Sequence, residues 1–250
     1  MARYDFRSPR LHVAAPLTAG ATVPLDRTQA NYLVNVLRLR PGDRVLVFNG
    51  RDGEWRATLR SGARRDAALA VAEQTRAQPA PGDLGLLFAP LKHARLDYMV
   101  QKAVEMGVSR LVPVLTRHGQ VARVNLERMQ ANAIEAAEQC GILALPEIAA
   151  PIALTDAVAG LGPARLVVFC DEEAEVRDPV AALAAARTGR EAMPPAVCIG
   201  PEGGFAEDER TALLRLPNVV RLALGPRILR ADTAAVAALA LVQAVLGDWR

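Results

Sequence analysis

The segments IGPEGGF (residues 199–205) and LGPRILRADTA (residues 224–234) carry the clearest information about the fold. Each follows an apolar run typical of a buried strand and leads into a helical pattern. Glycine permits positive φ and a close approach of the backbone to a ligand, and open parallel sheets bind ligands at the carboxyl ends of their strands. The first segment alone would equally suit a plain strand-to-helix connection. Two such segments at one sheet edge favour opposite walls of a ligand cleft.

The rest of the chain after residue 77 repeats this pattern of strand and helix. The apolar runs are LGLLFA (84–89), RLVPVL (110–115), RLVVFC (165–170), AVCIG (196–200) and VVRLAL (219–224). Longer helical patterns separate them. Continuous apolar strands alternating with helices indicate a parallel sheet that is covered on both faces, so the expected fold class is α/β.

Three helices can be predicted from their apolar stripes. The first spans residues 93–106 and ends at Gly107, with a buried stripe of Leu96, Met99, Val100, Ala103 and Val104. Asn125 caps the second, whose inward residues are Leu126, Met129, Ala133, Ala136 and Cys140. The last, from Asp232 or Thr233 to about Leu246, is apolar on nearly every side. Such a helix is buried in its domain or against another subunit, and we expect a homodimer.

The first third of the chain has a different pattern of apolar residues. Short period-two runs at 11–13, 21–25, 44–48, 54–59 and from 67 predict strands, and one helix is expected from Thr28. The apolar face of that helix would hold Tyr32, Leu33, Val36 and Leu37. This pattern indicates a small β-barrel that carries a helix. The linker candidate TRAQPAPGD (75–83) predicts two domains, residues 1–76 and residues 77–250.

The charge is divided unequally between these two domains. The 250-residue chain has a net charge of +3, but residues 1–76 contain 13 Arg and 7 acidic residues, giving +6, and the remainder carries −3. Such an imbalance favours a polyanion-binding first domain, although a solvated Arg-rich surface would give the same count. With 51% hydrophobic residues, the composition excludes an intrinsically disordered chain.

Several other classes of protein are excluded or disfavoured. The charged start MARYDFRSPR and the lack of an apolar run of ~18 residues predict a cytosolic protein with no membrane span. Cys140, Cys170 and Cys198 form no CxxC pair and are expected to be buried. His12, His93 and His118 have no metal-ligand spacing, so no metal is expected. The segment at 199–205 lacks the Lys-Ser/Thr of a P-loop, and no GxSxG elbow indicates acyl transfer.

Five segments together resemble a known family. These are NYLVNVLRLRPGD (31–43), KHARLDYMVQKAVEMGV (92–108), EAAEQCG (135–141) and the two glycine segments. In this order they resemble the ribosomal RNA small subunit methyltransferase E family, of the SPOUT class. The resemblance implies an N-terminal PUA-like RNA-binding β-barrel and a C-terminal SPOUT α/β domain with a deep trefoil knot. It also implies a homodimer that transfers a methyl group from S-adenosylmethionine to uracil N3 of a decoding-region uridine in 16S rRNA of the small ribosomal subunit.

The resemblance also assigns residues to roles. The cofactor-binding residues would be Phe169, Cys170, Glu172, Ile199, Gly200, Pro201, Gly203, Gly204, Leu224, Gly225, Ile228 and Leu229. Uracil N3 is a poor nucleophile until its proton leaves, which calls for a base or for a cation that stabilises the anionic ring. Glu202 is the candidate base and Arg230 the candidate cation. The expected RNA-binding residues are Arg3, Arg7, Arg10, Arg38, Arg40, Lys92 and Arg95.

The chain departs from the family pattern at two positions. It has Ile142 in the neighbourhood where the family commonly has Arg, so an RNA or substrate contact there is not assumed. It has Asp232 where the family has Glu, which keeps the charge. Two other functions stay open: a SPOUT methyltransferase that acts on another nucleotide or on a ribose 2′-hydroxyl, and a non-enzymatic RNA-binding ribosome assembly factor.

Overall fold

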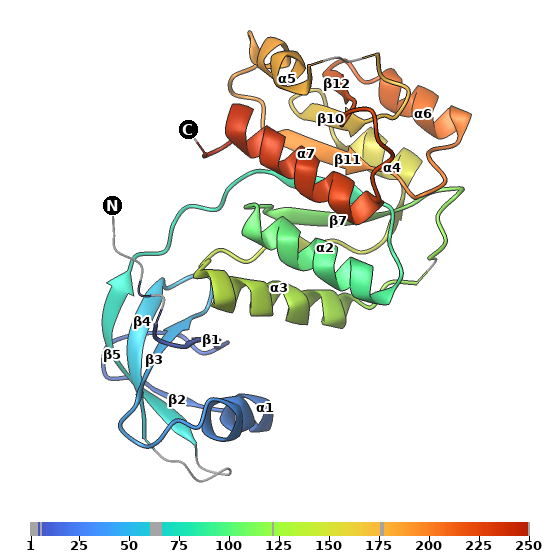
Figure 1. Cartoon of the computed structure of the whole chain (residues 1–250). Coiled ribbons are helices and arrows are strands. Elements are labelled where there is room, and N and C mark those ends of the chain that lie inside the picture. Colours follow the sequence, from blue (N-terminus) through green and yellow to red (C-terminus); the bar gives the residue numbers. More distant parts are fainter. Residues whose placement is uncertain (1–4, 6, 61–66, 122, 176–177, 250) are drawn as a thin grey trace. The chain divides into compact units, whose positions relative to one another are not determined.

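The computed structural model describes residues 5, 7–60, 67–121, 123–175 and 178–249, and it divides into two compact units (Figure 1). The N-terminal unit contains Met1–Pro81 and Ile134–Leu145, and the C-terminal unit contains Gly82–Ala133 and Pro146–Arg250. The sequence places the boundary near residue 77 and does not anticipate the inserted segment. Polar contacts tie this segment to the N-terminal unit. The backbone N–H of His12 donates to the Glu138 carboxylate at 2.8 Å.

A five-stranded sheet forms the N-terminal unit, in the order β1-β3-β4-β5-β2. Its elements are β1 (Arg10–His12), β2 (Thr22–Pro24), α1 (Arg27–Asn31), the π-helix η1 (Tyr32–Val36), β3 (Arg44–Phe48), β4 (Glu54–Leu59) and β5 (Ala68–Arg76). Strands β1 and β3 are parallel and the other pairs are antiparallel. Alternate side chains such as Val45, Val47 and Leu59 are fully buried in one core. The period-two strands predicted here are confirmed.

The helix predicted from Thr28 is only partly correct. Asp26 caps α1 through the backbone N–H groups of Thr28 and Gln29. The helix then continues as the π-helix η1, which has a wider turn. There the Leu37 N–H donates to the carbonyl oxygen of Tyr32, five residues earlier, at 2.9 Å. This wider turn rotates Val36 off the apolar face that the sequence assigned to it, and its side chain is 61% exposed.

A seven-stranded sheet forms the C-terminal unit, and all of its strand pairs are parallel. The strand order is β12-β10-β11-β6-β7-β8, and β9 also pairs with β7. The elements are β6 (Gly85–Phe88), α2 (His93–Glu105), β7 (Arg110–Leu115), α3 (Leu126–Cys140), β8 (Glu147–Ile148), β9 (Ile152–Ala153), α4 (Leu154–Gly160), β10 (Leu166–Cys170), α5 (Pro179–Arg187), β11 (Pro195–Ile199), α6 (Glu207–Leu214), β12 (Val219–Leu222) and α7 (Ala231–Val245). The second half of α3, from Ile134, belongs to the N-terminal unit. The predicted α/β class is confirmed.

Helices cover both faces of this sheet (Figure 1). Helices α2, α5 and α7 pack together, and α4 packs with α6. The N-cap predicted at Asn125 is present, because its side chain accepts the Arg128 N–H at 2.9 Å. The prediction that Cys140 faces inward is wrong, since this last residue of α3 is exposed. Among the described residues, no helix has the length and apolarity needed to cross a membrane.

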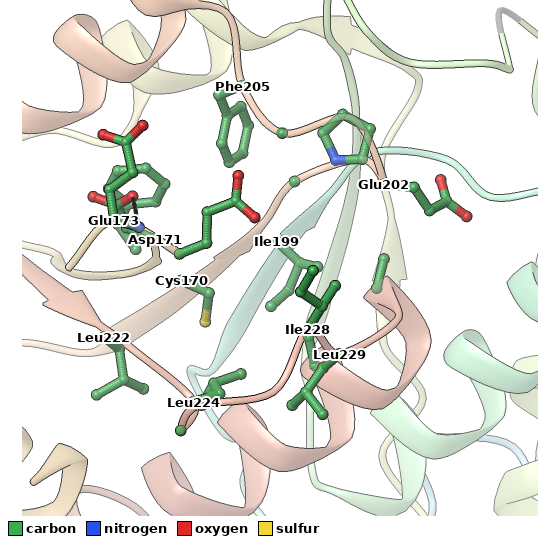
Figure 2. Close-up of a pocket in the computed structure, with 18 of the residues that line it drawn as sticks. Cys170, Asp171, Glu173, Ile199, Glu202, Phe205, Leu222, Leu224, Ile228 and Leu229 are labelled. Carbon is green, nitrogen blue, oxygen red and sulfur yellow. Dashed lines mark hydrogen bonds between the residues drawn. The ribbon is translucent and has the colours of Figure 1, made fainter. Parts of the chain in front are cut away.

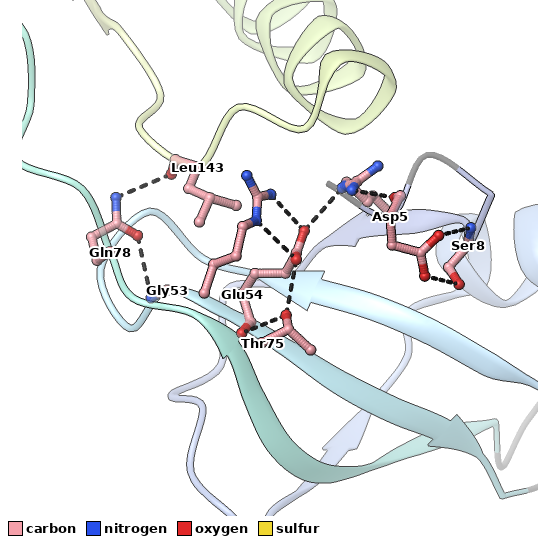
Figure 3. Close-up of polar contacts among 9 residues, drawn as sticks. Asp5, Ser8, Gly53, Glu54, Thr75, Gln78 and Leu143 are labelled. Atoms are coloured by element: carbon pink, nitrogen blue, oxygen red, sulfur yellow. Dashed lines mark hydrogen bonds and ion pairs between the residues drawn. The ribbon is translucent and has the colours of Figure 1, made fainter. Parts of the chain in front are cut away.

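A buried carboxylate holds three segments of the N-terminal unit together (Figure 3). Glu54, which begins β4 and is 2% exposed, accepts hydrogen bonds from Arg10 at 2.9 Å and from Arg76 at 2.6 Å. The Thr75 hydroxyl donates a further bond at 2.8 Å. Burial favours a higher pKa for Glu54, but the bonds from Arg76, Arg10 and Thr75 outweigh it and lower this pKa. The Arg10 guanidinium is therefore buried in this ion pair and is not accessible to a phosphate.

We predict that Glu54→Gln lowers the free energy of unfolding by about 3–5 kcal/mol, because two guanidinium groups lose their buried counter-charge. Urea unfolding at pH 7 measures this loss. The matched control is Glu73→Gln, whose partner is Arg56 on the same sheet and whose side chain is 61% exposed. It should cost less than about 1 kcal/mol. Equal losses in the two variants would contradict the assignment.

The same variant has a pH signature. Because the folded-state pKa of Glu54 is lowered from 4.5, the carboxylate stabilises the fold above pH 4.5 and loses this effect as the pH falls through the lower folded value. The stability difference between wild type and Glu54→Gln should therefore be constant near neutrality and shrink in acid.

Candidate functional site

A cavity of about 370 Å³ lies at the carboxyl ends of β10, β11 and β12 (Figure 2). Its walls come from residues 169–173, 199–205 and 222–229 and from the start of α7. The volume falls within the range of about 300–1,000 Å³ that is typical of small-molecule sites. All the predicted cofactor-binding residues except Gly203 line it. The two glycine segments therefore do form walls of one pocket.

Glycine is required at two points of the first wall. A side chain at Gly200 would meet the Phe205 ring at 2.8 Å. Gly204 has φ +70°, and a Cβ there would lie 3.3 Å from a Glu172 carboxylate oxygen. Phe205 itself packs edge-to-face on Phe169, with 5.5 Å between the ring centroids. This contact joins the segment after β11 to the end of β10.

Asp171 fixes the chain where it leaves β10. Its side chain is 3% exposed, and it accepts hydrogen bonds from Arg221 of β12 at 2.7 Å and from Arg210 of α6 at 3.1 Å. Arg221 also donates to the Glu173 carbonyl at 2.8 Å. One carboxylate thus connects three elements around the pocket.

The pocket has an apolar part and an acidic part (Figure 2). Ile199, Leu222, Leu224 and Leu229 contribute aliphatic surface, and Ile228 is 97% exposed at the mouth. The carboxylates of Glu172, Glu173 and Glu202 also belong to the lining. Such a site suits a ligand that combines an apolar or planar group with a positive charge.

The two candidate catalytic residues differ in their placement. Glu202 lines the pocket, its side chain is 40% exposed, and it accepts a hydrogen bond from Arg95 of α2 at 3.0 Å. Arg230 is the exposed residue directly before α7 and does not belong to the lining. The structure therefore brings Glu202 to Arg95, a pairing that the sequence did not predict.

Sequence reasoning missed several residues of the site. Glu173, Phe205, Arg210 and Leu222 line the pocket but were not predicted. Leu222 belongs to the predicted strand VVRLAL, so its position could have been predicted from the sequence. The pairing of Arg210 with Asp171 depends on the tertiary fold and could not. His118 is another missed contact. Its Nδ1 lies 3.2 Å from the Gly203 and Gly204 carbonyl oxygens, beside the first wall.

The candidate RNA-binding residues fall into three groups. Arg7, Arg38, Arg40 and Lys92 are exposed, Arg95 is ion-paired with Glu202, and Arg10 is buried against Glu54. Arg3 lies outside the described residues. In the part of the chain that the structure describes, no three His, Cys, Asp or Glu side chains gather as metal ligands would.

Two family models match the chain. The RNA methyltransferase domain matches residues 78–243, and the RNA methyltransferase PUA domain matches residues 25–71. The parallel α/β unit with its glycine-walled pocket and the curled N-terminal sheet thus define the class, an RNA methyltransferase with a PUA-like domain. The knot predicted for the C-terminal domain stays a prediction.

Matches to individual proteins identify the family within this class. The chain is 34% identical to ribosomal RNA small subunit methyltransferase E of Synechocystis over 95% of this chain and 78% of that protein, and 28% identical to the Rickettsia conorii protein of the same name over 94% of each. A crystal structure of ribosomal RNA small subunit methyltransferase E from Neisseria gonorrhoeae, bound to S-adenosylmethionine, matches with a TM-score of 0.81 and 27% identity over 98% of this chain and 100% of that one. A Legionella pneumophila methyltransferase with the same bound cofactor matches with a TM-score of 0.82 and 26% identity over 95% and 98%. The chain belongs to the ribosomal RNA small subunit methyltransferase E family.

The cysteines give a test of the pocket's wall. Burial raises the pKa of Cys170, which lines the pocket, to about 12, and it also raises the pKa of Cys198. Because the thiolate is the nucleophile, we predict that iodoacetamide at pH 8 alkylates the exposed Cys140 and spares the other two. Peptide mass spectrometry measures the rates. Labelling of Cys170 as fast as Cys140 would show that the sulfur lies in open water.

Proposed function

We propose that this protein uses S-adenosylmethionine to methylate uracil N3 of one decoding-region uridine in the 16S rRNA of the small ribosomal subunit. The observation that carries the proposal is the pocket at the carboxyl ends of β10, β11 and β12, in a chain whose relatives of the same family bind this cofactor. A ribosomal substrate makes the cytoplasm the proposed location, and the apolar α7 makes a homodimer the proposed assembly.

The pocket residues fit S-adenosylmethionine. Aliphatic side chains of Ile199, Leu224 and Leu229 suit the adenine ring, while the backbone of the glycine loops offers hydrogen-bonding groups to its edge. The Glu172 carboxylate complements the positive charge of the ligand, whereas the Glu173 carboxylate is paired with Arg210 at 3.0 Å. When bound, the cofactor supplies an electrophilic methyl carbon.

The protein's own residues then have three tasks. The pocket walls hold the acceptor nitrogen in line with the methyl carbon at about 3–3.5 Å. A Glu202 carboxylate oxygen accepts the N3 proton, and Arg95, bonded to the same carboxylate, holds it in position. Arg230 stabilises the negative charge that develops on a uracil carbonyl oxygen.

The exposed arginines of the N-terminal unit are the proposed phosphate contacts. Arg7, Arg38 and Arg40 retain free access to solvent, and Lys92 contributes from the N-cap of α2, whereas the Arg95 guanidinium is paired with Glu202. The target uracil has to leave its stack, or lie in an unpaired region, to reach the pocket.

The test of the function is nucleoside mass spectrometry of 16S rRNA from a strain that lacks the gene, before and after treatment of its small subunits with the purified protein. We expect 3-methyluridine to be absent before treatment and restored after it. Undiminished 3-methyluridine in the deletion strain would overturn the proposal. Loss of a different methylated nucleoside would assign another acceptor, and loss of none would favour an assembly factor.

Substitutions at the proposed catalytic residues should slow turnover on small subunits. We predict that Glu202→Gln lowers kcat about 10²- to 10⁴-fold, the usual contribution of a positioned base. Arg230→Ala should lower it about 10²- to 10³-fold. Glu207→Gln, an exposed carboxylate of α6 outside the pocket, is the matched control and should retain wild-type kcat. Near-wild-type turnover of Glu202→Gln or Arg230→Ala would remove that residue from the mechanism.

The phosphate contacts can be counted through salt dependence. Each phosphate neutralised contributes about 0.7–0.9 to the slope of log K against log salt concentration. The triple variant Arg7→Ala, Arg38→Ala, Arg40→Ala should therefore flatten the slope for small-subunit binding by about two to three. The control Arg110→Ala, Arg215→Ala on the C-terminal unit should keep the wild-type slope. An unchanged slope in the triple variant would exclude these arginines as phosphate contacts.

A further inference from the structure

A second cavity of about 140 Å³ lies in the C-terminal unit beside the first turn of α2. It is lined by Leu91, Lys92, His93, Leu96, Asp97, Val121, Arg123, Val124, Asn125, Arg128 and Met129. This volume is well below the roughly 300 Å³ at which pockets for whole small molecules begin. It suits a single ring.

The second cavity neighbours the first pocket, which lies at the carboxyl ends of β10, β11 and β12. Strand β6, which leads into it through Leu91, pairs in parallel with β11, which leads into the glycine loop. The Ala89 N–H donates to the Ile199 carbonyl oxygen at 3.1 Å across these two strand ends. On α2, Arg95 bonds Glu202 of the first pocket while the adjacent Leu96 lines the second. The first turn of α2 therefore stands between the two cavities.

The lining of the second cavity separates into an apolar floor and a cationic rim. Leu91 and Met129 are buried beneath it, and Val124 is half-buried at its side. Lys92, His93 and Arg123 are exposed around it. The other two charged residues of the lining, Arg128 and Asp97, pair with each other. The Arg128 Nε donates to the Asp97 carboxylate at 2.8 Å and lowers the pKa of that carboxyl.

We propose that this cavity binds the base of an unpaired RNA nucleotide adjacent to the methylated uridine, with the phosphate of that nucleotide on Lys92 and Arg123. The proposal rests on the proposed function and extends its substrate site from one nucleotide to two. Proteins read single-stranded RNA by stacking splayed bases on histidine or arginine planes and on apolar surface. His93, Arg123 and the floor provide these surfaces around a cavity whose size suits a single ring. A second base subsite also gives the enzyme a means of choosing one uridine among many.

The experiment compares the affinity of variants for small subunits purified from a strain that lacks the gene. Arg123→Glu removes a rim cation, and Val124→Trp fills the cavity. We expect each to weaken binding about 5- to 150-fold, the range that the loss of one stacked base produces. Affinity for S-adenosylmethionine, measured by calorimetry, should stay at the wild-type value in both, because neither residue lines the first pocket.

Matched controls sit elsewhere on the same unit. Arg215→Glu changes an exposed arginine, and Val180→Trp enlarges a valine that is 48% exposed; both lie outside the two cavities. Both should bind subunits like the wild type. Val124→Trp additionally should leave the salt slope unchanged, whereas Arg123→Glu should flatten it by at least about 0.7, since only the latter removes a phosphate contact.

The proposal is overturned if Arg123→Glu binds subunits no more weakly than Arg215→Glu. Because Arg123 is exposed, a folding defect does not account for its effect, and this variant decides the matter even if Val124→Trp fails to fold. Wild-type methylation of the same subunits tests the proposed function separately. The ratio of variant to wild-type affinity tests the second cavity alone.

Discussion

The pocket depends on one buried carboxylate, Asp171, at the end of β10. Two guanidinium groups, from Arg210 and Arg221, meet it, and they come from α6 and β12. A buried carboxylate without partners would cost several kcal/mol, so the site is stable only while both arginines are in place. This requirement fixes the end of β10 relative to α6, which begins just after the glycine loop, and relative to β12. The ion pairs of Asp171 therefore position the three loops that form the walls of the pocket.

The N-terminal unit uses the same arrangement. There one carboxylate, Glu54, lies between two arginines of which one, Arg10, is 3% exposed, and it joins the first strand to the last. This pairing changes the meaning of the +6 charge of residues 1–76, because Arg10 and Arg76 are counted in it but their charge is directed inward. The cations that remain for a polyanion are those on the surface, such as Arg38 and Arg40. The net charge of a segment therefore overstates the charge that a partner meets.

Local patterns predicted much of the fold. The strands β3, β4 and β7 have the bounds that period-two and continuous apolar runs indicate, because these patterns reflect burial on one face or on both. The glycine loops were predicted as pocket walls because glycine permits positive φ and a close backbone approach, and Gly204 does have a φ of +70°. Long-range pairings were not predictable. Nothing adjacent in sequence marks Arg210 as a partner of Asp171, Arg95 as a partner of Glu202, or Arg10 as a buried residue. The π-helix likewise follows from how Tyr32–Val36 packs, since its residues read as an ordinary α-helix.

The central claim is that the pocket organised by Asp171 binds S-adenosylmethionine. Titration calorimetry of this cofactor into wild type and Asp171→Asn tests it most directly, with Asp208→Asn, an exposed carboxylate paired with Arg117, as the control. The account predicts one site per chain in the wild type and in the control. It predicts an affinity at least about tenfold weaker in Asp171→Asn, equivalent to about 1.4 kcal/mol. No heat of binding in the wild type, or equal affinity in Asp171→Asn, would contradict it.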